Sequence, residues 1–68
     1  MRKNFGERLK ELRNEKGLSC RQLAQEIGVS GSSIVRWENG QNDILAELLI
    51  KLADFFGVSM DYLLGREG

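Results

Sequence analysis

The 68-residue chain has no proline, no histidine and only one cysteine. The absence of proline removes the strongest helix breaker and favours an all-α fold. A single cysteine excludes an internal disulfide, which agrees with a reducing compartment. Histidine, metal-ligating clusters and a phosphate-cradling glycine loop are missing, so the sequence predicts no metal, no cofactor and no enzyme. No apolar run reaches the roughly 20 residues of a membrane span and no signal peptide is visible, so we expect a cytoplasmic protein.

Residues 19–28 carry a full set of signals for a short helix. Gln22 stands three residues after Ser19, which is the spacing of a capping box. Three apolar residues then recur at helical spacing and share one face: Leu23, Ala24 and Ile27. Gly28 stands where a left-handed residue commonly ends a helix. The pattern predicts a helix over about 19–27.

A second short helix is predicted over about 30–38. Ser30 is placed to cap it, Ile34 and Trp37 share its inward face, and Asn39-Gly40 ends it. About three turn residues separate the two helices, which is the spacing of a helix-turn-helix motif. In that motif the second helix is presented to the major groove of DNA.

Three further helices are predicted over about 3–16, 44–56 and 59–64. Asp43 is placed to cap the second of these, Gly57 to end it, and Ser59 to cap the last. Five helices joined by short connections predict a compact bundle that forms a single domain over residues 1–68.

Several short motifs occur in order along residues 5–65: Leu12-Arg13, Gly17-Leu18-Ser19, Gln22-Leu23-Ala24, Gly28-Val29-Ser30, Ile34, Trp37-Glu38-Asn39-Gly40, Leu52 to Ser59 and Asp61 to Leu64. Together they resemble the five-helix DNA-binding domain of the phage repressor and Cro family, the XRE-type helix-turn-helix. The resemblance implies a lambda-repressor-like bundle that binds double-stranded DNA through the helix over about 30–38.

The resemblance implies a set of DNA-contacting residues: Cys20, Arg21, Ser30, Gly31, Ser32, Ser33, Arg36 and Asn39. Among these, Gly31, Ser32 and Arg36 are expected to face the base edges. Arg36 is the only side chain of the set on this helix that can make a bidentate contact with guanine. The backbone amides of Cys20 and Arg21, at the start of the preceding helix, are expected to hold a phosphate.

Other residues receive structural roles. The resemblance implies a partly buried ion pair between Arg13 and Glu38, which would tie the first helix to the end of the recognition helix. Trp37 is expected in the core rather than stacked on a base, because it shares a face with Ile34. Cys20 replaces a glutamine that is usual in the family, and we interpret it as a tolerated small residue rather than a redox switch.

The start of the helix over about 44–56 has more apolar residues than one buried face requires. Leu49, Ile50, Leu52, Ala53 and Phe56 are expected to supply its core side. Ile44, Leu45 and Leu48 remain, and their spacing lets them form one patch. An exposed apolar patch indicates a partner surface, so we expect a dimer there, formed on DNA even where the free protein is monomeric.

Two functions are consistent with these features. The first is a sequence-specific DNA-binding transcriptional regulator that binds a palindromic operator as a dimer, with no small-molecule ligand evident. The second is a protein-interaction module that retains the fold but binds DNA weakly or not at all. The second is motivated by the zero net charge and by the uncharged Gln41-Asn42 loop, because phosphate contacts supply most non-specific affinity. The basic excess in the first sixteen residues favours the first.

Overall fold

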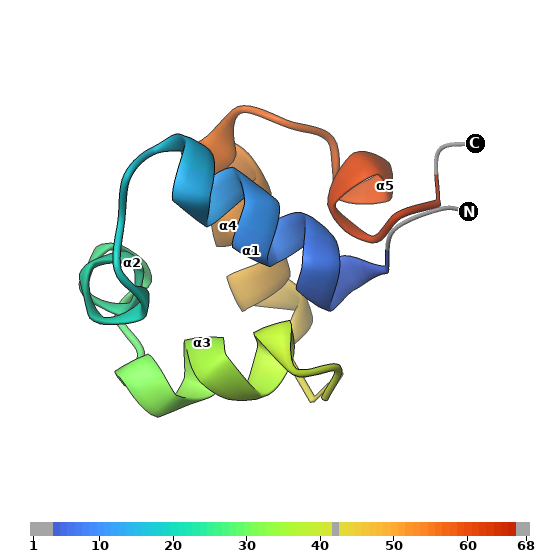
Figure 1. The fold of residues 1–68 in the computed structure, drawn as a ribbon. Coiled ribbons are helices and arrows are strands. Elements are labelled where there is room, and N and C mark those ends of the chain that lie inside the picture. The colour runs from blue at the N-terminus through green and yellow to red at the C-terminus, as the bar shows by residue number, and fades with distance from the viewer. Residues whose placement is uncertain (1–3, 42, 67–68) are drawn as a thin grey trace.

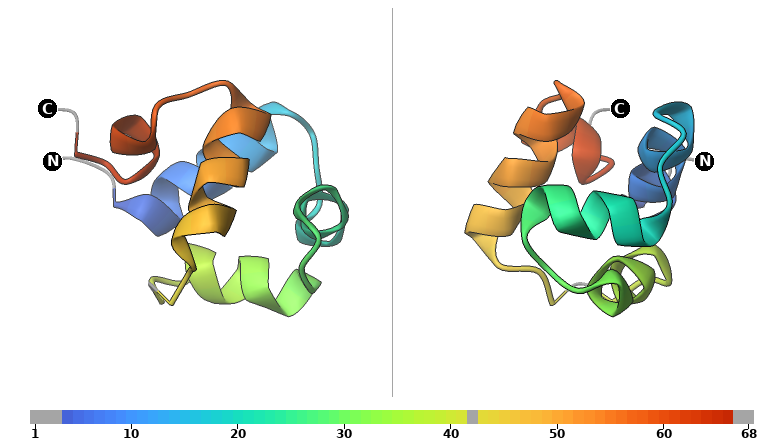
Figure 2. Two further views of the ribbon diagram at one scale, coloured as in Figure 1. Left: turned by 180° about the vertical axis from the view of Figure 1, so that it is seen from behind. Right: turned by 90° about the vertical axis from the view of Figure 1, so that its left-hand side faces the viewer.

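The computed structural model describes residues 4–41 and 43–66. Within them it has five helices, which are α1 (Phe5–Glu15), α2 (Cys20–Ile27), α3 (Gly31–Glu38), α4 (Ala46–Phe56) and α5 (Met60–Leu63). Helix α1 lies in front of α4, with α2 at the left, α3 below and α5 at the right (Figure 1). Seen from behind, α4 crosses α1 and begins close to the end of α3 (Figure 2). The all-α, five-helix prediction is confirmed; none of the described helices is long and apolar enough to cross a membrane.

Local capping signals set most of the helix ends. The Ser19 hydroxyl accepts the backbone N–H of Gln22 at 3.0 Å, and the Gln22 side chain accepts the Ser19 N–H at 2.8 Å. Gly28 ends α2 with a φ of 87°, a left-handed conformation that glycine adopts without a steric penalty. Gly57 and Ser59 also occupy their predicted places, at the end of α4 and the start of α5.

One predicted cap is confirmed in position only, and another is wrong. Ser30 occupies the N-cap position of α3 but makes no side-chain capping bond, because its hydroxyl pairs with Ser32 and Ser33 instead. Asp43 does not cap α4, which begins later with Leu45 as the N-cap residue. The Asp43 carboxylate is already committed to side chains of α3. The predicted start of α1 at residue 3 lies outside the described residues.

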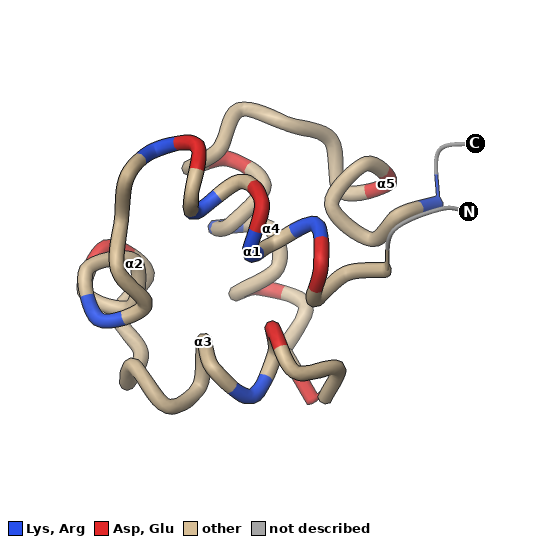
Figure 3. The backbone as a smooth tube through the Cα atoms, in the orientation of Figure 1, with Lys and Arg blue, Asp and Glu red and all other residues tan. Residues whose placement is uncertain are grey.

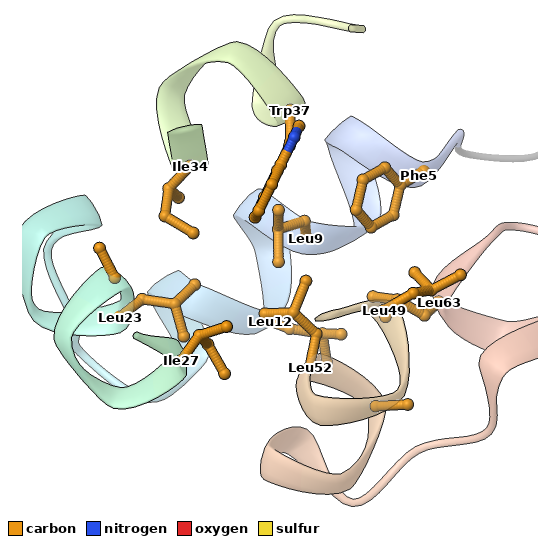
Figure 4. Packing of buried hydrophobic residues seen from close by; sticks show 12 residues of the cluster. Phe5, Leu9, Leu12, Leu23, Ile27, Ile34, Trp37, Leu49, Leu52 and Leu63 are labelled. Carbon is orange, nitrogen blue, oxygen red and sulfur yellow. The ribbon is translucent and has the colours of Figure 1, made fainter. Parts of the chain in front are cut away.

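One fully buried aliphatic side chain comes from each helix, and together these form the centre of the core: Leu9, Leu23, Ile34, Leu52 and Leu63. The Trp37 ring points from α3 into the same cluster, near Leu9 and Phe5 of α1 (Figure 4). Burial of each such side chain contributes about 1.5–3 kcal/mol, so each helix is held by the common core. Ile50 was expected in the core but is 47% exposed.

Gly6 lies at a close contact between α1 and the end of α3. A Cβ atom added to Gly6 would lie 2.6 Å from the carbonyl oxygen of Trp37 and 2.8 Å from that of Glu38. Both contacts are with backbone, which cannot rotate away as a side chain can. The absence of a side chain at this position therefore sets how the end of α3 sits against α1.

We expect Gly6→Ala to destabilise the domain by about 1–3 kcal/mol or more, because either α1 or α3 must move to admit the methyl group. Thermal or urea unfolding followed by circular dichroism measures this. Gly31→Ala is the matched control, since its Cβ would meet its nearest atom, the Cα of Arg21, at an ordinary 3.6 Å. The control should change stability by less than about 1 kcal/mol. Equal effects of the two substitutions would contradict the close contact.

Candidate nucleic-acid interface

Helices α2 and α3 form a rigid pair joined by a three-residue connection, residues 28–30. Val29 in this connection packs partly against the core. The first residue of α3, Gly31, lies against the first turn of α2, next to Arg21. The right-hand view of Figure 2 shows the two helices side by side. This is the geometry of a helix-turn-helix motif, in which α2 fixes the orientation of α3.

Helix α3 has a core face and an outer face. Ile34 and Trp37 are 0% and 2% exposed and anchor the core face. The outer face presents the exposed Ser32 and the Arg36 side chain, which is 41% exposed. It also presents Val35, which is 45% exposed and lies one helical turn after Gly31. Among the residues expected at the bases, Ser32 and Arg36 are therefore accessible, while Gly31 is half-buried beside α2.

Val35 is not among the residues predicted from the sequence for the outer face of α3, although its spacing indicates that it lies there. It stands four residues after Gly31, on the face where the predicted contacts gather. A small apolar side chain in the major groove can contact the methyl group of thymine. Asn39 is an exposed residue at the C-cap of α3, near the same face.

Three serine hydroxyls gather at the start of α3. The Ser30 Oγ lies 3.0 Å from the Ser32 Oγ and 3.2 Å from the Ser33 Oγ. A hydroxyl can both donate and accept, so this cluster offers either kind of hydrogen bond to an incoming group. The first amides of a helix also need partners from outside the helix. The start of α3 is thus polar but carries no charge.

The start of α2 offers backbone amides. The first bond within this helix runs from the Leu23 N–H to the Ser19 carbonyl oxygen at 3.0 Å, so the amides of Cys20 and Arg21 precede it. The Arg21 side chain is exposed. The Cys20 side chain points inward, with its Sγ 3.9 Å from Glu38 Oε1. Cys20 therefore presents its backbone amide, and not its thiol, at the start of α2.

A largely buried ion pair joins α1 to the end of α3. Arg13 donates from Nε to Glu38 Oε2 at 2.7 Å and from Nη2 to Glu38 Oε1 at 3.1 Å. Its Nη1 donates to the Leu18 carbonyl oxygen at 2.7 Å, which also ties in the loop before α2. The two side chains are only 12% and 7% exposed. The hydrogen bond to Glu38 raises the pKa of Arg13, outweighing the opposing effect of desolvation.

We expect Arg13→Gln and Glu38→Gln each to destabilise the domain by about 3–5 kcal/mol, because each leaves a buried charge without its partner. The double variant should lose clearly less than the sum, with a coupling energy of about 1 kcal/mol or more. Chemical unfolding of the four proteins gives this cycle. Lys10→Gln, an exposed change on α1, should alter stability by less than about 0.5 kcal/mol. Additive single losses would show that the pair is not coupled.

A second network, missed from the sequence, joins α3 to the loop that follows it. The Asp43 carboxylate accepts the indole N–H of Trp37 on Oδ1 at 2.9 Å and an N–H of Arg36 on Oδ2 at 3.0 Å. Partial desolvation acts to raise the pKa of Asp43, but the bonds from Trp37 and Arg36 together lower it. The available signal was Trp37 itself, since a buried indole N–H usually has an acceptor.

The basic residues of α1 are interspersed with acidic ones. Lys and Arg alternate with Glu along α1 (Figure 3). Arg8 lies over the Tyr62 ring at 4.1 Å, Lys16 lies over the Phe55 ring at 5.3 Å, and Arg13 pairs with Glu38. Arg2 and Lys3 lie outside the described residues. The positive charges on α2 and α3 are Arg21 and Arg36.

The predicted apolar patch is only partly exposed. Leu45 is 61% exposed, whereas Ile44 and Leu48 are half-buried and pack against the core. Leu45 is therefore the member of the patch that is most available to a partner.

Comparison with known proteins agrees with this geometry. The helix-turn-helix family profile matches residues 9–63. The HTH-type transcriptional regulator ImmR of Bacillus subtilis (strain 168) is 31% identical over 64 residues, which cover 94% of this chain and 50% of that protein. The chain thus spans about half the length of this relative.

Solved structures show the same fold. The P22 c2 repressor in complex with a synthetic operator matches with a TM-score of 0.88 and 29% identity, over 96% of this chain and 98% of that one. A structure of iron(II) HppE in complex with substrate matches with a TM-score of 0.83 and 28% identity, over 94% of this chain and 37% of that one. The chain belongs to the helix-turn-helix family of the phage repressor and Cro (XRE) type.

Proposed function

We propose that this domain binds double-stranded DNA in a sequence-specific manner and regulates transcription. Helix α3 enters the major groove, and the first turn of α2 rests on the sugar-phosphate backbone. The observation that carries the proposal is the two-sided α3, fixed inward by Ile34 and Trp37 and accessible outward at Ser32, Val35 and Arg36. The P22 c2 repressor, similar over almost its whole matched chain, is in complex with an operator. We propose no catalytic role for this domain. We also propose that it acts in the cytoplasm.

Within this function the contacts divide by chemistry. The amides of Cys20 and Arg21 and the Asn39 side chain are assigned to phosphates, which set register without reading sequence. Ser32 and Arg36 are assigned to contacts with base edges. Ser30 and Ser33, at the start of α3, are assigned to contacts with the DNA beside them. The half-buried Gly31 lets the backbone come close to the DNA. Val35 is assigned to a thymine methyl group.

We expect Arg36→Ala to remove most of the preference for a selected DNA site while leaving the helix content intact. A bidentate contact with guanine contributes about 1–3 kcal/mol of discrimination, or roughly 5- to 150-fold. A site is first selected from a pool of random duplexes, and affinities for it and for random DNA are then measured at one salt concentration. Lys51→Ala, which removes an exposed positive charge from α4, is the control. An undiminished preference in a folded Arg36→Ala protein would contradict the role.

We further propose that two copies bind a palindromic operator and meet through Leu45, Ile44 and Leu48. Such a dimer places its two recognition helices about 34 Å apart, one turn of DNA. The contact surface formed by these three residues is small. We therefore expect two copies to pair more strongly on DNA than in free solution. The half-buried Ile44 and Leu48 support the exposed Leu45 from beneath.

We expect Leu45→Glu to weaken binding to the full operator by about tenfold or more, because it brings two like charges together near the two-fold axis. Binding to a half-site should change little, and so should thermal stability, since Leu45 is 61% exposed. Ile50→Glu, on an exposed position of the same helix, is the matched control. Equal losses on full and half sites, or a larger loss with Ile50→Glu, would place the contact surface elsewhere.

A protein-interaction module with weak DNA binding is the second candidate. It is favoured by the zero net charge and by the pairing of Arg36 with Asp43, which offsets the one positive charge on α3. The selection experiment separates the two functions, because a module of this kind would enrich no sequence from the random pool even at low salt.

A further inference from the structure

Arg36 is a restrained side chain although it lies at the surface. Its Nη2 donates to Asp43 Oδ2 at 3.0 Å, and the two side chains are 41% and 53% exposed. An exposed arginine ordinarily samples many rotamers, and it loses that freedom when it binds. An isolated surface ion pair would restrain it little, because both partners are mobile and hydrated.

Here the carboxylate partner is itself anchored. Asp43 Oδ1 accepts the indole N–H of Trp37 at 2.9 Å, and Trp37 is 2% exposed with its ring in the core. The ring is fixed by packing between α3 and α1 (Figure 4). Oδ1 is therefore bonded to a rigid group, and Oδ2 accepts the bond from Arg36. The position of the guanidinium is thus coupled to the core through two hydrogen bonds.

The same arrangement biases the acceptor that Arg36 can take. A guanidinium has five N–H donors in a fixed fork, and the bond to Asp43 uses one of them. A guanine edge presents two neutral acceptors, O6 and N7, to such a fork. A phosphate would bring a negative charge toward the Asp43 carboxylate, which like-charge repulsion opposes. The pair therefore disfavours a phosphate more than a base edge.

We propose that Asp43 is a positioning residue for base recognition, which holds Arg36 toward a guanine in each half-site and keeps it from pairing with backbone phosphates. The inference rests on the proposed function and deepens it, because it names the base and a residue that sets specificity without touching DNA. On this proposal, the loop between α3 and α4 contributes to sequence specificity through Asp43.

The test uses Asp43→Asn in the full chain, which keeps an acceptor for Trp37 and removes the charge. A selected site is compared with the same site carrying 7-deazaguanine, which lacks the N7 acceptor. The native protein should lose about fivefold or more in affinity on this change. Asp43→Asn should lose less than about twofold, and its affinity for random DNA should rise, because its arginine is released to phosphates.

Glu47→Gln is the matched control, since Glu47 is an exposed acidic residue in the first turn of α4. It removes the same charge, so it should raise random-DNA affinity but retain the full 7-deazaguanine loss. In an Arg36→Ala background, Asp43→Asn should have no more effect than Glu47→Gln. Circular dichroism establishes that each variant is folded, and the indole N–H resonance of Trp37 reports whether its acceptor is kept.

The outcomes are distinguishable from those for the proposed function. If no sequence is enriched by the native protein, the proposed function fails and this inference fails with it. If a site is enriched and Asp43→Asn keeps the full 7-deazaguanine loss, the positioning role is overturned while DNA recognition stands. An equal rise in random-DNA affinity for Asp43→Asn and Glu47→Gln would also overturn it, because the arginine would then not have been restrained.

Discussion

The burial of Trp37 is the constraint on which most of this structure depends. Its ring fills the core between α3 and α1, and its carbonyl oxygen lies where Gly6 allows α1 to approach. A buried indole N–H also needs an acceptor, because an unsatisfied donor costs about 1–3 kcal/mol. Asp43 supplies that acceptor, so the loop after α3 is drawn to the surface of α3. One residue thereby contributes to the core packing, to the contact between α1 and α3, and to the surroundings of Arg36.

The two arginines bonded to carboxylates show how burial changes the role of the same group. The side chains of Arg13 and Glu38 are only 12% and 7% exposed, and three hydrogen bonds hold the guanidinium. Such a pair is expensive to break, and it fixes how α1 and α3 meet. Arg36 and Asp43 remain about half exposed, and their bond uses one of the five N–H donors of the guanidinium, so the other donors stay accessible. Burial thus gives Arg13 a structural role and leaves Arg36 accessible for the recognition role proposed for it.

The helices and most of the core could be predicted from the sequence because their signals are local. The capping box at Ser19 and Gln22, the glycine that ends α2 and the apolar spacing of Ile34 and Trp37 each act within a few residues. The failures come from tertiary competition. Asp43 has the side chain of an N-cap, but the Trp37 N–H and Arg36 take its carboxylate. Ile50 has the character of a core residue, yet the face of α4 on which it lies is not covered within the described residues.

The candidate site was harder to predict, because side-chain direction and pairing depend on neighbours distant in sequence. Cys20 stands at a family position for phosphate contact, but its thiol points toward Glu38 on α3, eighteen residues further along the chain. Ser30, Ser32 and Ser33 pair with one another rather than with the backbone of the first turn. Arg36 is identifiable from the sequence as the long donor of α3, but its bond to Asp43 depends on the position of the loop after α3. The local sequence pattern therefore predicts which residues lie at the candidate site, whereas the directions and partners of their side chains come from the structure.

A domain without net charge can still distinguish DNA sequences. Phosphate attraction strengthens binding to every sequence alike, so its loss lowers overall affinity without lowering the ratio between two sites. That ratio depends on contacts with base edges, and it is greater when the contacting group is held in place than when it is free to bind a nearby phosphate. If Asp43 positions Arg36 as proposed, an acidic residue beside α3 lowers the overall affinity for DNA and raises this ratio. The neutrality of the chain, which argued against DNA binding, is therefore compatible with selective binding at modest strength.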